Sequence, residues 1–222
     1  MKTSGNTILI TGGGSGIGRE LALRFNDLGN DVIVAGRRLD ALEETIAGRT
    51  GMHAITLDVE SAESIAAFAA KLVADHPRLN VVFNNAGMMR TDDLSRGDGL
   101  NGAEETIVTN LLGPIRLNAA LVDHLTAQAD AAIVNVSSGL AFVPLTKAPV
   151  YSATKAAIHS YTVTLREQLR GSVEVIELAP PAVQTGLTPG QSTREGYMPL
   201  NDYIDEVMSL FATRPTPEEI LV

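Results

Sequence analysis

Thr11-Gly12-Gly13-Gly14-Ser15-Gly16-Ile17-Gly18 follows the apolar run Thr7–Thr11 and leads into a segment with helical spacing, residues 16–28. A strand, a glycine-rich turn and a helix in this order are typical of a dinucleotide phosphate site. Gly12 allows the tight turn, Gly16 lets backbone approach a pyrophosphate, and Gly18 permits close helix–strand packing. The spacing is G-x-x-x-G-x-G, and a merely flexible turn is the alternative. This stretch predicts nucleotide binding.

Strand-like and helix-like segments alternate along the rest of the chain. Short, nearly continuous apolar runs predict further strands at residues 31–35, 52–57, 80–83, 131–136 and 173–178. Helical spacing predicts helices at residues 39–47, 61–75, 103–128 and 151–169. This alternation implies a parallel sheet with crossover helices. We therefore expect an α/β fold, a single doubly wound Rossmann-type domain over residues 1–222, with a substrate-loop excursion at about residues 180–200.

Composition excludes several classes of protein. The chain has 26 acidic and 17 basic residues, a net charge of −9, 45% hydrophobic residues and no cysteine. A chain this apolar can form a core, whereas disulfides, thiolate metal sites and a nucleic-acid partner are not expected. No run of 18 apolar residues or basic leader is present, which predicts a cytoplasmic protein without a membrane partner. The four histidines, His53, His76, His124 and His159, show no ligand-like spacing, so no metal site is expected.

Three later motifs join the glycine-rich turn. They are Asn84-Asn85-Ala86-Gly87, Ser138, and Tyr151-Ser152-Ala153-Thr154-Lys155. Together, from about residue 7 to 200, the four motifs resemble the short-chain dehydrogenase/reductase family. The resemblance implies a Rossmann-type oxidoreductase that moves a hydride between a nicotinamide and a small-molecule carbonyl or alcohol. It also implies a homodimer or homotetramer.

The end of the second predicted strand bears on the choice of nicotinamide cofactor. An acidic residue there would bind the ribose 2′-hydroxyl and repel a 2′-phosphate, but Gly36 occupies the place. Arg37 and Arg38 follow, and a guanidinium pairs well with a phosphate. We expect NADP(H), with NAD(H) as the alternative. A solvated basic pair at the strand end is the other interpretation of these arginines.

The resemblance extends the set of cofactor-binding candidates. It implies that Asp58 binds the adenine edge, although a helix cap or turn is an equal alternative, and that the Asn84–Gly87 segment passes beneath the cofactor. It also implies that Val183 meets the carboxamide and Thr185 a phosphate or amide. The full set is Gly12, Gly14, Ser15, Gly16, Ile17, Gly18, Arg37, Arg38, Asp58, Asn85, Ala86, Gly87, Tyr151, Lys155, Pro180, Val183 and Thr185.

Tyr151 and Lys155 are four residues apart, so their side chains leave one face of a helix. A phenol with a pKa of about 10 is a poor base, but a nearby ammonium and a positive nicotinamide would lower that pKa. We expect Tyr151 to act as general acid or base. By resemblance, Ser138 donates to the substrate oxygen, and Asn110 interrupts a helix and holds a water on the proton path. Without the resemblance, Asn110 would be an ordinary helical residue.

The chain departs from the family pattern in two places. Pro180-Pro181 replaces the usual Pro-Gly after the sixth strand, which stiffens that turn. The sequence stops at Val222, where family members usually add a final strand. We therefore expect either a lost tail or a sheet one strand short.

The substrate pocket is expected to be mainly apolar. Its predicted wall consists of Leu140, Phe142, Val143, Leu187, Tyr197 and Met198. The resulting prediction is an NADP-dependent oxidoreductase for a small hydrophobic carbonyl or secondary alcohol. An NAD-dependent alcohol dehydrogenase and a non-catalytic NADP-binding sensor or scaffold are the alternatives, because fold alone does not establish activity.

Overall fold

Seven parallel strands form one sheet in the computed structural model, which describes residues 1–95 and 102–222. The strand order is β3-β2-β1-β4-β5-β6-β7, so the winding direction reverses between β1 and β4. Ligands of such sheets bind at this reversal, beyond the carboxyl ends of the strands. The strands are β1 (Thr7–Thr11), β2 (Asp31–Gly36), β3 (Met52–Thr56), β4 (Leu79–Asn84), β5 (Ala132–Val136), β6 (Glu174–Ala179) and β7 (Glu219–Leu221).

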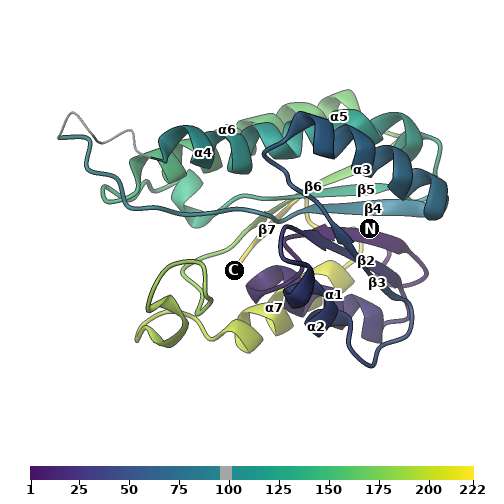
Figure 1. The fold of residues 1–222 in the computed structure, drawn as a ribbon, viewed down its shortest axis with the longest axis horizontal. Helices are drawn as coiled ribbons and strands as arrows, with labels where there is room; N and C mark the ends of the chain where they lie inside the picture. Colours follow the sequence, from purple (N-terminus) through teal and green to yellow (C-terminus); the bar gives the residue numbers. More distant parts are fainter. Residues whose placement is uncertain (96–101) are drawn as a thin grey trace.

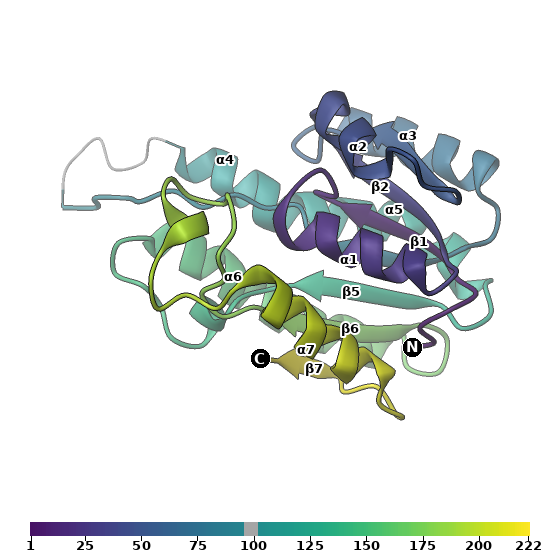
Figure 2. The same ribbon diagram turned by 90° about the horizontal axis from the view of Figure 1, so that it is seen from below.

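Helices cover both faces of the sheet (Figures 1 and 2). One face carries α1 (Gly16–Asp27), α2 (Leu39–Ile46) and α7 (Leu200–Ala212). The other carries α3 (Ala62–Asp75), α5 (Gly113–Thr126) and α6 (Pro149–Gln168). The predicted doubly wound α/β fold is confirmed, with most predicted element boundaries displaced by only one or two residues.

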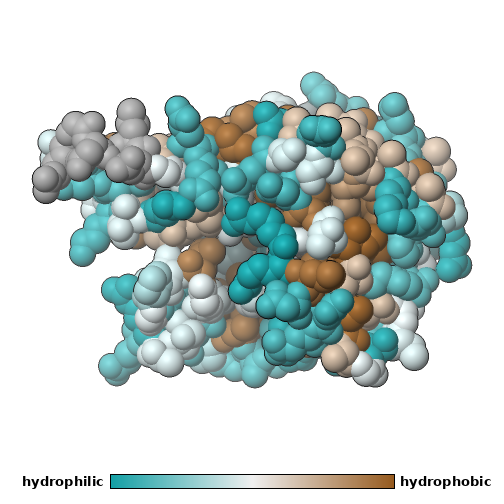
Figure 3. Space-filling model, viewed as in Figure 1, coloured by the Kyte–Doolittle hydropathy of each residue, from teal (hydrophilic) through white to brown (hydrophobic). Residues whose placement is uncertain are grey.

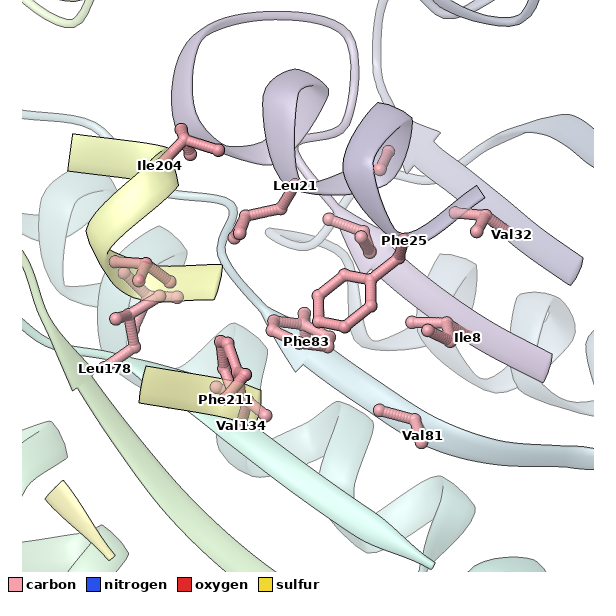
Figure 4. Packing of buried hydrophobic residues seen from close by; sticks show 14 of the residues in the cluster. Ile8, Leu21, Phe25, Val32, Val81, Phe83, Val134, Leu178, Ile204 and Phe211 are labelled. Atoms are coloured by element: carbon pink, nitrogen blue, oxygen red, sulfur yellow. The ribbon is translucent and has the colours of Figure 1, made fainter. Parts of the chain in front are cut away.

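The core beneath α1 and α7 is built around three phenylalanines (Figure 4). Phe25 of α1, Phe83 of β4 and Phe211 of α7 have ring centroids 5.3 to 5.7 Å apart and tilted or edge-on planes. Aromatic rings prefer such geometries because the positive edge of one meets the negative face of another. This packing fixes α1, and with it the glycine-rich turn, against the centre of the sheet.

The predicted helix at residues 103–128 is in fact three segments. They are α4 (Ala103–Ile107), a π-helical turn η1 (Val108–Leu112) and α5. Asn110 is the middle residue of η1. A π-turn within a helix often marks a functional site, because it displaces one residue from the regular ladder.

The C-terminal region supplies a seventh strand to the sheet. Helix α7 packs on α1, and β7 pairs with β6 through Glu177–Glu219, Leu178–Ile220 and Ala179–Leu221. The expectation of a sheet one strand short was wrong, because a three-residue strand suffices to pair with the end of β6. Ile220 is fully buried and joins the same core as Phe211.

The excursion at residues 180–200 is held by a few specific bonds. Val183 and Met198 form an isolated parallel bridge, in which the Met198 N–H donates to Ala182 O at 2.9 Å. A short turn, η3 (Gln191–Thr193), carries Gln191, whose amide donates to Val183 O at 2.8 Å. The excursion therefore has a defined conformation next to the carboxyl ends of the strands. Among the helices of the described residues, none is long and apolar enough to span a bilayer.

Candidate active site

A cavity of about 440 Å³ lies at the carboxyl ends of β1, β4, β5 and β6. The segment after β4 and the excursion after β6 face each other across it, and the space-filling view is hollowed on this side (Figure 3). Predicted site residues that line it are Gly12, Ser15, Gly16, Ile17, Gly18, Asn85, Ala86, Gly87, Ser138, Tyr151, Lys155, Pro180, Val183 and Thr185. The fold thus brings most of the sequence-derived set together.

The glycine-rich turn wraps the start of α1 at one end of the cavity. Gly12 and Gly16 have φ values of +68° and +54°, a region that favours glycine. A Cβ on Gly18 would lie 2.4 Å from Asn85 Nδ2 and 2.5 Å from Gly12 O, so no side chain fits there. The side chain of Ser15 makes no cap hydrogen bond, which leaves the first N–H groups of α1 available to an anion.

Gly14 has another position. It lies against α2, where a Cβ would be 3.2 Å from the Ala41 Cβ, and it does not line the cavity. Its role in the turn is close packing against a neighbouring helix.

Thr11, which the sequence analysis did not select, joins the turn to the segment after β4. Its hydroxyl oxygen accepts from the N–H groups of Asn85 and Ala86, both at 3.0 Å. The Asn85 side chain returns a bond from Nδ2 to Thr11 O at 2.9 Å. A buried threonine at the strand end, directly before the first glycine, was the available signal. These three bonds fix the two motifs relative to each other.

Tyr151, Lys155 and Ser138 form the polar wall of the cavity. Tyr151 and Lys155 are buried one turn apart at the start of α6, and Lys155 Nζ lies 5.5 Å from the centre of the Tyr151 ring. Lys155 Nζ donates to Val136 O at 2.9 Å. Ser138 follows β5, lies beside the Tyr151 phenol and accepts from Leu140 N at 3.1 Å. A phenol and a serine hydroxyl thus meet beside a buried amine.

Burial dominates the protonation of this group. It raises the pKa of Tyr151 to about 12, although the hydrogen bond with Ser138 acts in the opposite direction. Burial also lowers the pKa of Lys155 to about 8. In the protein alone the pKa of Tyr151 is thus raised, because desolvation disfavours a phenolate more than the nearby groups stabilise it. The expected lowering by the ammonium together with a positive nicotinamide remains a prediction.

Asn110 lies behind this wall rather than in it. Its Oδ1 accepts from Met88 N at 2.9 Å, and its Nδ2 donates to Met88 O at 2.8 Å and to Thr154 Oγ1 at 3.3 Å. A Cβ on Gly87 would lie 3.3 Å from Asn110 Oδ1 and 3.7 Å from Lys155 Nζ. The π-turn thus presents an amide to the chain next to Lys155, and the predicted water remains a prediction.

Arg37, Arg38 and Asp58 lie near the ends of β2 and β3, outside the residues that line the cavity. Arg37 Nη1 pairs with Glu60 Oε1 at 2.8 Å, and Arg38 is the residue before α2. Asp58 Oδ1 accepts from Glu60 N at 3.0 Å, as in a turn. The adenine and 2′-phosphate roles of these residues remain predictions.

The excursion closes the far side of the cavity. Thr185 approaches the glycine-rich turn, since a Cβ on Gly16 would lie 3.6 Å from its Cβ. Gln191, which sequence reasoning missed, also lines the cavity and donates to Thr185 Oγ1 at 3.1 Å. No local sequence pattern marks Gln191 as a cavity residue, because its position depends on how the whole excursion folds.

The predicted apolar wall is mostly elsewhere. Of its six residues only Leu187 lines the cavity, whereas Phe142 and Val143 are 47% and 73% exposed. Phe142 packs edge-on against His159 instead. The cavity is lined by Met88, Met89 and Arg90 of the segment after β4, and Arg90 pairs with Glu105 of α4.

The lowered pKa of Lys155 predicts a pH dependence of stability without cofactor. As the pH rises from 8 to 10 the folded amine loses its proton, whereas the unfolded one, with a pKa of about 10.4, still mostly binds it. The free energy of unfolding should therefore rise over this range, by on the order of 2 kcal/mol from this group. Urea unfolding of wild type and Lys155→Met at both pH values measures the difference. An equal rise in the two proteins would contradict the assignment.

Known proteins are similar to this chain in sequence and in fold. The family described as short chain dehydrogenase matches residues 6–196. An uncharacterized oxidoreductase, DltE of Bacillus subtilis, is 46% identical over 88% of this chain and 79% of its own length. A sulfoacetaldehyde reductase of Chromohalobacter salexigens is 34% identical over 82% of this chain and 74% of its own.

A solved short-chain dehydrogenase from Sphingobium yanoikuyae in complex with NADPH has a TM-score of 0.84 and 27% identity. The match covers 97% of this chain and 86% of that one. The family match spans most of the sequence, and the strand, glycine turn and tyrosine helix described above all lie within it. The chain therefore belongs to the short-chain dehydrogenase/reductase family of oxidoreductases.

Proposed function

We propose that this protein is an NADP(H)-dependent oxidoreductase acting on a carbonyl or secondary alcohol of a small, mainly hydrophobic substrate. The observation that carries the proposal is a single cavity. The N-terminus of α1, which has no side-chain cap, lies at one end of it, and Ser138, Tyr151 and Lys155 lie on its wall. A phosphate-binding helix start and an acid–base group in the same cavity are what hydride transfer to a carbonyl requires.

The cavity fits a nicotinamide dinucleotide. Glycine at positions 12, 16 and 18 leaves backbone surface where a Cβ would clash or strain the chain, and Ser15 and Thr185 offer hydroxyls beside it. Asn85, Ala86, Gly87, Pro180 and Val183 would continue the cofactor contacts along the carboxyl edge. Such a cofactor, when bound, supplies or accepts the hydride.

Tyr151 would hold and transfer the proton at its hydroxyl oxygen. With its raised pKa the phenol is protonated at neutral pH, which suits donation to a carbonyl oxygen during reduction. Ser138, on the same wall beside that phenol, would donate to the same oxygen. Lys155 would orient the ribose and lower the tyrosine pKa when protonated. Asn110 would carry the water that links Lys155 to the exterior.

The preference for NADP(H) over NAD(H) rests on the end of β2. Gly36 leaves no carboxylate to bind a 2′-hydroxyl, and Arg37 and Arg38 follow directly. Arg37 is more than half exposed and holds an ion pair with Glu60, so its guanidinium is accessible from solvent. In this proposal a 2′-phosphate competes with Glu60 for Arg37, and Asp58 binds the adenine edge.

The apolar part of the remaining wall supports the proposed substrate class. Met88, Met89 and Leu187 give the cavity apolar surface at the segment after β4 and in the excursion.

An NAD-dependent alcohol dehydrogenase and a non-catalytic NADP-binding sensor or scaffold are the competing functions. We also propose a homodimer or homotetramer, the assembly expected from the family resemblance.

A panel of carbonyls and alcohols tests the proposed function. NADPH oxidation, followed by nicotinamide absorbance, should be fastest with short hydrophobic ketones or aldehydes and slower with NADH. Activity confined to polyols or dicarboxylates would refute the substrate class. NADPH binding without turnover on any member of the panel would favour the sensor.

Tyr151→Phe tests the acid–base assignment. The ring still packs against its neighbours, but the proton donor is gone, so turnover should fall about 10²- to 10⁴-fold while NADPH affinity is kept. Tyr161→Phe on the same helix is the matched control, because Tyr161 does not line the cavity. Near-normal turnover of Tyr151→Phe on a good substrate would show that the proton comes from another group.

Arg37→Asp tests the cofactor preference. It replaces a phosphate-pairing cation by a group that repels a phosphate and accepts a 2′-hydroxyl. The ratio of NADPH to NADH dissociation constants should move about ten- to a hundredfold towards NADH, the value of one charge-assisted pair. Arg49→Asp is the control for the charge change. Arg49 precedes β3 and pairs with Asp27 of α1. An unchanged ratio would remove Arg37 from the site.

A further inference from the structure

Three potential metal ligands meet on the face of β6 and β7 that α6 covers. They are His159 of α6, Glu177 of β6 and Glu219 of β7, and one ligand atom from each lies within 4.8 Å of the others. Glu177 and Glu219 are register partners in the parallel pair β6–β7, so their side chains leave the same face of the sheet. None of the three lines the cavity described above.

Neighbouring side chains hold the ligands in place. Ser137 Oγ donates to Glu177 Oε1, which leaves Oε2 directed at the imidazole, where His159 Nδ1 lies 2.6 Å away. The Phe142 ring packs edge-on against the imidazole, with centroids 4.8 Å apart. Outer contacts that fix a carboxylate and an imidazole in this way are a usual feature of metal sites, because they orient the ligand atoms in advance.

The charges of the group are not balanced by a fixed cation. Glu177 has no exposed side-chain surface, and its one ion-pair partner in the described part of the chain is the titratable His159. Glu219 pairs with no lysine or arginine among residues 1–95 and 102–222, whereas its neighbour Glu218 pairs with Arg166. A buried carboxylate beside a second one needs a compensating positive charge, which a bound cation would supply.

We propose that His159, Glu177 and Glu219 bind a divalent first-row metal ion such as Zn²⁺ or Mn²⁺. One imidazole and two carboxylates are a ligand set that suits these ions better than Mg²⁺ or Ca²⁺, which prefer oxygen ligands alone. Ligand atoms 2.0–2.2 Å from a shared ion lie about 3–3.5 Å apart. Binding therefore requires His159 and Glu177 to separate slightly while Glu219 approaches.

The ion would act on the structure rather than on the proposed chemistry. The ion would join the edge strand β7 to α6. Arg166 of α6 already connects the helix to this edge, because it donates to Val175 O in β6 and to Glu218 O directly before β7. The ion would also lie behind Ser137, the residue before Ser138. The site departs from the expectation of no metal, because three residues from distant parts of the sequence give no ligand spacing.

Calorimetric titration of the EDTA-treated full chain with ZnCl₂ and MnCl₂ tests the proposal. Wild type should bind one equivalent with a rise in Tm, and MgCl₂ should bind much more weakly. Glu219→Gln and His159→Gln should each weaken Zn²⁺ binding more than about tenfold. Glu218→Gln, which changes the adjacent exposed carboxylate, should bind as wild type does.

Two controls test whether the ion binds at these three residues and whether the variants fold. His53 and His76 form an imidazole pair elsewhere in the molecule, with ring centroids 4.9 Å apart, so His53→Gln should leave the titration unchanged. NADPH affinity should be the same in wild type and Glu219→Gln, which also shows that the variant is folded. The proposal is overturned if wild type shows no saturable binding, or if Glu219→Gln and His159→Gln keep wild-type affinity.

Discussion

The contact of Asn85 with the glycine-rich turn is the constraint on which the site depends. Asn85 Nδ2 donates to Thr11 O, and a Cβ at position 18 would clash with this Nδ2 atom. Because that place is glycine, α1 can begin directly against the ends of β1 and β4. The helix start, the segment after β4 and the cavity between them therefore have one fixed geometry, which the Phe25–Phe83–Phe211 packing supports from below.

The acid–base group is held in an environment that opposes its charges. Tyr151 and Lys155 are buried on the wall of the cavity, and burial shifts both pKa values towards the neutral forms. A neutral phenol is the proton donor for reduction, whereas oxidation of an alcohol needs the phenolate. In the proposed function the positive charge of an oxidised nicotinamide would favour that phenolate. The same wall would then serve either direction, according to the charge of the cofactor beside it.

Local sequence patterns were sufficient for the parts of the structure that rest on local rules. The glycine-rich turn, the alternation of strands and helices, and Tyr151 and Lys155 on one helix face all follow from spacing. Helix α7 was not predicted, although Tyr203, Val207 and Phe211 have a helical spacing that could have indicated it, and the three residues of β7 are too few to show a pattern. The π-turn at Asn110 depends on bonds to Met88, 22 residues away, and no helical periodicity reveals it.

The apolar wall of the cavity was harder to predict, because the directions of its side chains depend on the conformation of the short turn after Ser138. Phe142 and Val143 follow Ser138 closely, yet the turn directs them outwards, and Met88 and Met89 take their place. Glu177 and Glu219 are likewise brought together by β6–β7 pairing, which sets their register across more than forty residues of sequence. Helix α6 places His159 beside them. Such groups are determined by tertiary structure, whereas the phosphate turn is determined by its own backbone.

The most direct test of the account is the NADPH dissociation constant of Asn85→Ala beside that of wild type, measured by nicotinamide fluorescence. The substitution removes the bond to Thr11 O but leaves the glycines, Tyr151 and Lys155 in place. If the Asn85 contact sets the geometry of the phosphate turn, affinity should fall about tenfold or more, the value of roughly 1.4 kcal/mol, while the protein remains folded. Unchanged affinity in a folded Asn85→Ala protein would contradict the central claim that this contact organises the cofactor site.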